Sequence, residues 1–107
     1  MDKVIFHIDE NSKWPTVMSN LANYLEERSD SDIKVVANGD AVIGYRDNKE
    51  VRNFIKNHPQ ITFDSCHNAM QSHDVSEEEL PEDVIQVPAG IPAIVGYQNE
   101  DYRYIKP

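Results

Sequence analysis

The sequence is poor in cysteine, in basic residues and in long apolar runs. Its 107 residues include one cysteine, Cys66, so an internal disulfide and a Cys-x-x-Cys site are both excluded. Ten basic residues face 19 acidic ones, and the resulting net charge of -9 opposes binding to nucleic acid and to anionic membranes. No apolar run approaches the roughly 18 residues of a membrane span. We therefore expect neither nucleic acid nor a membrane among its partners.

The amino terminus also lacks the parts of a secretory signal. From Met1 the chain passes directly into a strand-like run at residues 3–8, without a basic region, a long apolar segment or a small-residue cleavage site. A lone thiol in an acidic chain of this kind is typical of proteins in a reducing compartment. The sequence therefore predicts a cytoplasmic protein.

Patterns typical of strands and of helices alternate along the whole chain, which predicts a single domain over residues 1–107. Strands are expected at residues 3–8, 33–37, 61–64, 84–87 and 102–105. Apolar residues spaced by three and four predict helices from about residue 13 to 28, from 51 to 58 and after Gly90. Residues 41–45 fit either a strand extension or a short helical turn. This alternation indicates an α/β fold, a parallel sheet with right-handed crossovers and helices on both faces.

Ligands of such a sheet bind outside the carboxyl ends of its strands. Four polar or glycine-containing junctions meet there, at residues 7–11, 37–40, 64–68 and 87–90. Cys66 lies in the third junction, just past its strand and at the start of an expected helix. Free N–H groups at a helix start favour a thiolate, which is the reactive form of cysteine. A buried cysteine that acts only as a small apolar side chain fits the position equally well.

Other residues of these junctions are candidates for the same site. His67 follows Cys66 directly, and His7 ends the first strand, from where it can approach the thiol. Three asparagines suit a polar pocket, but each suits a cap or a turn equally: Asn11, Asn38 and Asn68. Gly39 belongs to a turn signal, and Gly90 to a strand-to-helix turn whose N–H groups can face a ligand.

Signatures of metal, nucleotide and phosphoacceptor sites are missing. The histidines at 7, 58, 67 and 73 include no pair at ligand spacing, and no phosphate-binding glycine loop occurs, so no metal or cofactor is expected. Asp9, Asp64 and Lys106 follow or end strands, as the acids and the lysine of receiver domains do. The fourth strand, however, ends without the serine or threonine of a receiver, which argues against that interpretation.

Several blocks of residues spread along the chain carry a family resemblance. The most specific are residues 63–70 around Cys66 and the closing residues 102–107; weaker blocks are residues 4–9 followed by Trp14, and residues 20–25, 33–39 and 87–91. Together they resemble the DsrE/DsrF-like sulfur-relay family, in its small stand-alone branch.

The resemblance implies a three-layer α/β/α domain with a mostly parallel five-stranded sheet, in a YchN-like, flavodoxin-like arrangement. It also implies assembly into trimers or hexamers, with protein donors and acceptors of sulfur. Cys66 would accept sulfane sulfur as a persulfide, Asn68 and nearby N–H groups would stabilise an anion, and His7 would line the pocket. Two alternatives stay open: a domain that binds a small ligand without sulfur transfer, and an interaction protein in which Cys66 belongs to the core.

Overall fold

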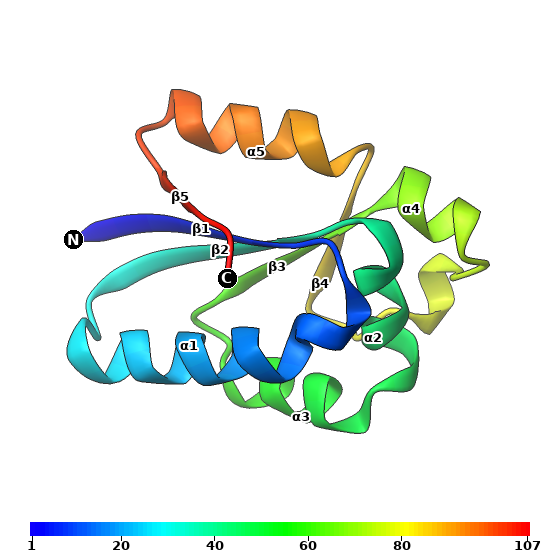
Figure 1. Ribbon diagram of the computed structural model, residues 1–107, viewed down its shortest axis with the longest axis horizontal. Helices are drawn as coiled ribbons and strands as arrows, with labels where there is room; N and C mark the ends of the chain where they lie inside the picture. Colours follow the sequence, from blue (N-terminus) through cyan, green and yellow to red (C-terminus); the bar gives the residue numbers. More distant parts are fainter.

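Five parallel strands form one sheet, in the order β4-β3-β2-β1-β5. The computed structural model describes residues 1–107 (Figure 1). The strands are β1 (Asp2–Ile8), β2 (Ser31–Ala37), β3 (Thr62–Cys66), β4 (Val84–Val87) and β5 (Arg103–Ile105). The expected α/β fold with a five-stranded parallel sheet is confirmed.

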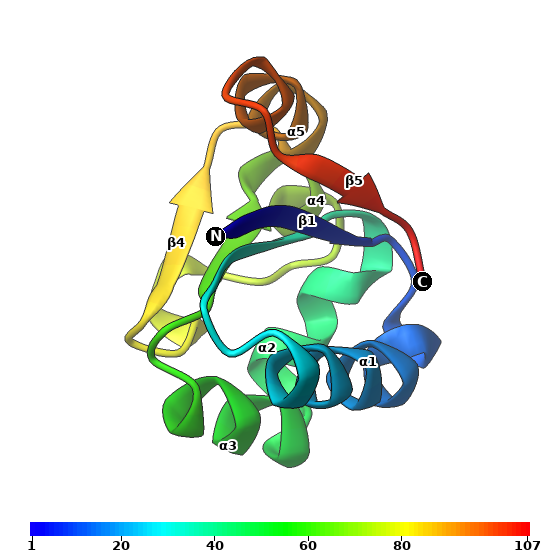
Figure 2. The same cartoon turned by 90° about the vertical axis from the view of Figure 1, so that its left-hand side faces the viewer.

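Helices cover both faces of the sheet, as Figure 2 shows. They are α1 (Trp14–Glu27), α2 (Val42–Asp47), α3 (Lys49–Asn57), α4 (His67–Ser72) and α5 (Gly90–Asn99). The chain steps from β1 to β4 in one direction and then returns past β1 to reach β5. Since parallel crossovers are right-handed, the returning connection must cross the opposite face. This places α5 apart from α1 and α3, on the other side of the sheet.

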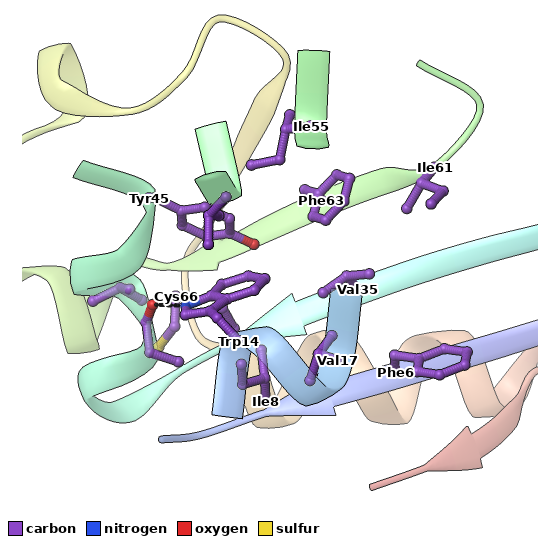
Figure 3. Packing of buried hydrophobic residues seen from close by; sticks show 14 of the residues in the cluster. Phe6, Ile8, Trp14, Val17, Val35, Tyr45, Ile55, Ile61, Phe63 and Cys66 are labelled. Carbon is purple, nitrogen blue, oxygen red and sulfur yellow. Dashed lines mark hydrogen bonds between the residues drawn. The ribbon is translucent and has the colours of Figure 1, made fainter. Parts of the chain in front are cut away.

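The larger core lies between the sheet and the α1 side (Figure 3). The expected helical stripe buries Trp14, Val17 and Leu21 completely or nearly so, and Pro15 stands in the first turn, where no N–H bond is lost. Trp14 Nε1 donates to the carbonyl of Ala41 at 2.9 Å, which ties α1 to the turn before α2. This bond satisfies the single polar atom that the buried indole carries.

The α5 face of the sheet holds a smaller and more polar core. Only four buried apolar residues cluster there, namely Ile5, Val36, Ile94 and Tyr102. Charged side chains share this face, among them Lys34, which bonds the hydroxyl of Thr62 at 3.3 Å and pairs with Asp32 at 3.3 Å. The attachment of α5 to the sheet therefore depends on polar contacts to a greater degree than that of α1.

Several expected boundaries are wrong by a few residues. β3 continues past Asp64 to Cys66, because residues 65 and 66 still pair with β4. Residues 41–45 are helical rather than an extension of β2. A short 3-10 turn, Asn11–Lys13, precedes α1, which begins without a side-chain cap.

No helix of the structure combines the length and the apolar character that crossing a membrane requires.

Two glycines give a matched test of this packing. A Cβ at Gly44 would lie 2.2 Å from Trp14 Nε1, whereas a Cβ at Gly96 on α5 meets no atom within 4 Å. We expect Gly44→Ala to lower the free energy of unfolding by about 3 kcal/mol through overpacking. Gly96→Ala should raise it by up to about 1 kcal/mol, because alanine favours a helix. Urea unfolding measures both, and equal effects would contradict this packing.

Candidate functional site

The structure brings four of the candidate residues together at the carboxyl edge of the sheet. His7 Nε2 lies 2.8 Å from Asn38 Oδ1, which joins the ends of β1 and β2. A Cβ built on Gly90, the first residue of α5, would lie 3.1 Å from Asn38 Cβ and 3.5 Å from Cys66 Cβ. The site is thus assembled from three strand ends and the start of α5.

Cys66 occupies the last position of β3 and caps the amino end of α4. Its Sγ accepts a hydrogen bond from the backbone N–H of Ala69 at 3.5 Å. The residue is 5% exposed and closes the edge of the larger core (Figure 3). Cys66 is therefore both an apolar packing residue and a sulfur atom held by a main-chain donor.

A chain of side-chain hydrogen bonds fixes the imidazole of His7, which is 6% exposed. Its Nδ1 lies 2.6 Å from the Tyr104 hydroxyl, and its Nε2 lies 2.8 Å from the amide oxygen of Asn38. That oxygen only accepts, so Nε2 carries the hydrogen. With the hydrogen on Nε2, Nδ1 is the ring atom that can accept from the Tyr104 hydroxyl. Since the amide oxygen of Asn38 is used, its NH₂ group remains available to a ligand.

The absence of a side chain at Gly90 allows α5 to begin directly over the strand ends. A Cβ there would be in ordinary contact with Val36 Cγ1 at 3.5 Å, but at 3.1 Å from Asn38 Cβ it would require Asn38 to shift by a few tenths of an ångström. The strand-to-helix turn noted in the sequence is therefore a close approach of backbone to the site. Its N–H groups at the helix start carry the positive end of the α5 dipole.

A cavity of about 270 Å³ adjoins this site between α5, β1 and β5. Its walls are His7, Ile91, Ile94, Val95, Gln98 and Tyr104. It lies where the strand order reverses between β1 and β5, which is the position at which open α/β sheets bind ligands. The sequence analysis did not predict the contribution of Gln98 or Tyr104.

The remaining candidates lie apart from this cluster or serve the backbone. Asn68 is exposed, and its carbonyl accepts from Ser72. Asn11 faces α2, where its Oδ1 is buried without a partner and would lie 3.0 Å from a Cβ at Gly44. Gly39 has φ of +54°, and a Cβ there would lie 2.6 Å from the Asp9 carbonyl, so it serves the turn. His67 adjoins Cys66, and its Nδ1 is buried without a partner.

The sequence analysis named Asp64 only as an acid at a strand end and did not predict that its carboxyl is the most deeply buried one of the site region. Asp64 is fully buried, and its Oδ2 accepts from the Tyr97 hydroxyl of α5 at 2.5 Å. Its Oδ1 has no hydrogen-bond partner. Burial raises the pKa of this carboxyl above its usual value, while the Tyr97 bond and the charge of Lys34 act against that rise. An acid inside a strand that is buried on both sides of it was the available signal.

The burial of Asp64 also rules out the phosphoacceptor arrangement. Lys106 Nζ, after β5, forms an ion pair with Asp9 Oδ1, after β1, at a distance of 3.2 Å. Asp64 instead faces α5 beneath the edge of the sheet. The structure gathers no group of three or more His, Cys, Asp or Glu side chains able to hold a metal ion.

Comparison with solved structures identifies the fold. A protein of unknown function from Methanobacterium thermoautotrophicum, MTH1491, superposes with a TM-score of 0.90 and 28% identity over 100% of both chains. The ychN protein from E. coli gives a TM-score of 0.82 and 11% identity over 100% of both chains. The chain has a YchN-like fold. BT1422 from Bacteroides thetaiotaomicron, a conserved protein of unknown function, gives a TM-score of 0.75 and 18% identity over 98% of this chain and 95% of that one.

No family model and no curated protein matches the sequence. The solved structures therefore support the DsrE/YchN-like fold that the resemblance implied.

The raised pKa of Asp64 has a measurable effect on stability. The folded state holds this proton more tightly than the unfolded chain does. The contribution of protonated Asp64 to the free energy of unfolding is therefore fully present below the unfolded pKa of ~3.9. It is lost as the pH rises through the folded pKa. We expect the stability of wild type relative to Asp64→Asn to fall as the pH increases from about 4 to about 8. Urea unfolding across this range measures the difference.

Asp32 is the matched control, because it also accepts from a tyrosine hydroxyl, that of Tyr102, at 2.5 Å. Burial raises the pKa of Asp32, but bonds from Tyr102 and Lys34 more than offset it and leave this pKa below its usual value. The stability of wild type relative to Asp32→Asn should therefore rise with pH. If the two stability differences changed with pH in the same direction, the opposite pKa shifts of Asp64 and Asp32 would be contradicted.

Proposed function

We propose that this protein is a sulfurtransferase-like carrier in which Cys66 holds sulfane sulfur as a persulfide between a donor protein and an acceptor protein. The observation that carries the proposal is the placement of the single cysteine. Cys66 stands at the carboxyl edge of the sheet, under the start of α5, and its sulfur accepts from a backbone N–H. This is where open parallel sheets place their ligands.

The chemistry needs one sulfur nucleophile and no second cysteine. The Cys66 thiolate attacks the outer sulfur of a donor persulfide, the donor S–S bond breaks, and its electron pair leaves on the donor sulfur as a thiolate. Unloading reverses these roles, with a thiolate of the acceptor as the attacking group. Sulfur passes on without net oxidation of the carrier, and the lone Cys66 suits this sequence of steps.

The surroundings of Cys66 support a held persulfide. At 5% exposure the sulfur is shielded from small thiols, which would otherwise remove the outer sulfur. The Ala69 N–H stabilises negative charge on Sγ. His67 Nδ1, buried and unpartnered, belongs to the next residue and is a further polar group for an added sulfur. In this proposal Asn68 contributes to anion stabilisation only through its backbone N–H, since its side chain is exposed.

An oligomer, a trimer or a hexamer, is part of this proposal. Large apolar side chains remain exposed next to the site, on α5 and on the edge strand β5: Ile91 at 56%, Val95 at 49%, Tyr104 at 40% and Ile105 at 43%. Contiguous apolar surface beside an unpaired strand edge is typical of protein interfaces. We place the protein in the cytoplasm, where a lone thiol remains reduced.

The test is the intact mass of the protein after incubation with a polysulfide donor. We expect wild type to gain one sulfur, about 32 Da, which dithiothreitol removes once the protein is denatured. Cys66→Ser differs by one atom and should gain nothing. A wild-type protein that folds but takes up no sulfur, under conditions that load a low-molecular-weight thiol, would contradict the proposal.

A second candidate function is the binding of a small ligand without sulfur transfer. The cavity at the reversal between β1 and β5 supports it, because apolar walls from α5 meet the polar groups of His7, Gln98 and Tyr104. Pockets of this kind combine apolar area with a few orienting polar groups. The fitting ligand is small and apolar, with one polar end.

The two candidates differ in their dependence on Cys66. If the cavity is the functional site, a ligand found by thermal-shift screening should stabilise Cys66→Ser as much as wild type. Val95→Trp, which adds an indole at the cavity wall, should abolish the shift. Ile85→Trp on β4 is the control, since Ile85 is also exposed, at 52%, but lies outside the cavity. A shift that is lost in Cys66→Ser would contradict this second function.

A further inference from the structure

The cavity between α5, β1 and β5 presents few polar atoms to a ligand. Its α5 wall is mostly apolar, because three of the helical residues that line it share one face of the helix: Ile91, Ile94 and Val95. The polar walls are His7, Gln98 and Tyr104. Gln98 is exposed, and its amide both donates and accepts, so it does not select between kinds of ligand. The chemical selectivity of the cavity therefore depends on His7 and Tyr104.

Both ring nitrogens of His7 are used within the protein. Nε2 lies 2.8 Å from Asn38 Oδ1, and an amide oxygen only accepts, so the ring hydrogen is on Nε2. Nδ1 is then the acceptor, and it lies 2.6 Å from the Tyr104 hydroxyl, which donates to it. The residue is 6% exposed. His7 therefore offers a ligand the surface of its ring but no free nitrogen.

The Tyr104 hydroxyl is left with accepting capacity alone. Its one hydrogen is directed at His7 Nδ1, and no group of the chain donates to its oxygen, which has two lone pairs. A ligand that donates to this oxygen adds a hydrogen bond and breaks none. A ligand with only an acceptor would have to draw the hydroxyl hydrogen away from His7, and this would leave a buried nitrogen unpaired.

We propose that the cavity binds a small apolar molecule whose polar end is a hydrogen-bond donor, an alcohol or an amine, and that Asn38 sets this preference through His7. The inference rests on the second candidate function and names its class of ligand. The donor bonds the Tyr104 oxygen, and the apolar body covers Ile91 and Val95, which are 56% and 49% exposed. Asn38 does not line the cavity, so it is a positioning residue.

The experiment compares matched six-membered rings, because a cavity of about 270 Å³ suits small probes. Binding to wild type is measured by the NMR shifts of the Ile91 and Ile94 backbone amides at pH 8, where imidazole in water carries one hydrogen. Cyclohexanol and cyclohexanone share ring and oxygen, but only the alcohol donates. We expect the alcohol to bind about tenfold more tightly. Cyclohexylammonium, which only donates, should also bind more tightly than the ketone. A ketone that equals or exceeds either donor overturns the proposal.

A change outside the cavity tests the role of Asn38. Asn38→Leu removes the acceptor of Nε2, so the ring can carry its hydrogen on either nitrogen, and the Tyr104 hydroxyl can then donate to a ligand. Alcohol and ketone should bind this variant about equally well. Asn53→Leu is the matched control on exposed α3, where the side chain lines no wall of this cavity, and the tenfold preference should remain. A purely structural role of Asn38 predicts weaker binding of both probes at an unchanged ratio, which would overturn the proposal.

A second measurement needs no variant and covers the case in which Asn38→Leu does not fold. The nitrogen NMR shifts of the His7 ring in wild type report which nitrogen carries the hydrogen. We expect the Nε2–H form, since Asn38 Oδ1 accepts from Nε2. The Nδ1–H form would turn the Tyr104 hydroxyl into a donor toward the cavity and would overturn the proposal.

The design separates this inference from the function on which it rests. If alcohol and ketone bind equally and Val95→Trp abolishes both, the cavity is a binding site and only the donor preference fails. If none of the three rings shifts the cavity amides of wild type, the second candidate function is contradicted, and the inference fails with it.

Discussion

The return of the chain from β4 to β5 organises the site of this protein. Right-handed crossover geometry sends this connection over the face of the sheet opposite α1 and α3, so that α5 covers that face alone. The helix begins at Gly90, where a Cβ would lie tightly against Asn38, at 3.1 Å, and in ordinary contact with Cys66, at 3.5 Å. The strand ends, the thiol and the adjoining cavity all take their relative positions from this one packing contact.

The two faces of the sheet have different physical characters. The α1 side is a continuous apolar core centred on Trp14, Tyr45 and Phe63, and it accounts for most of the buried apolar surface (Figure 3). The α5 side has few apolar contacts and places the Asp64–Tyr97 and Asp32–Tyr102 pairs beneath the helix. Buried polar pairs add little net stability, since desolvation offsets their attraction. Such pairs hold α5 in one orientation on the sheet.

The burial of Cys66 is compatible with its chemistry as a carrier. A fully accessible persulfide would lose its outer sulfur to any thiol, whereas one under the start of α5 waits for a partner that reaches this edge. The exposed apolar residues of α5 and β5 lie beside the same edge. In the proposed carrier, the burial of Cys66 would serve storage of the sulfur, and the adjoining exposed surface would serve recognition of a partner protein.

The α/β alternation, the helical stripe of α1 and the place of Cys66 at a strand end follow from the sequence alone, because local periodicity and turn residues encode them. Periodicity does not encode which strand ends become neighbours. The contact of His7 with Asn38 and Tyr104, the approach of Gly90 to Cys66 and the burial of Asp64 under Tyr97 join residues that are 24 to 97 positions apart. These contacts depend on strand order and on the face that α5 covers. Only the tertiary structure therefore decided which residues surround the thiol and that the Asp64 carboxyl is buried against α5.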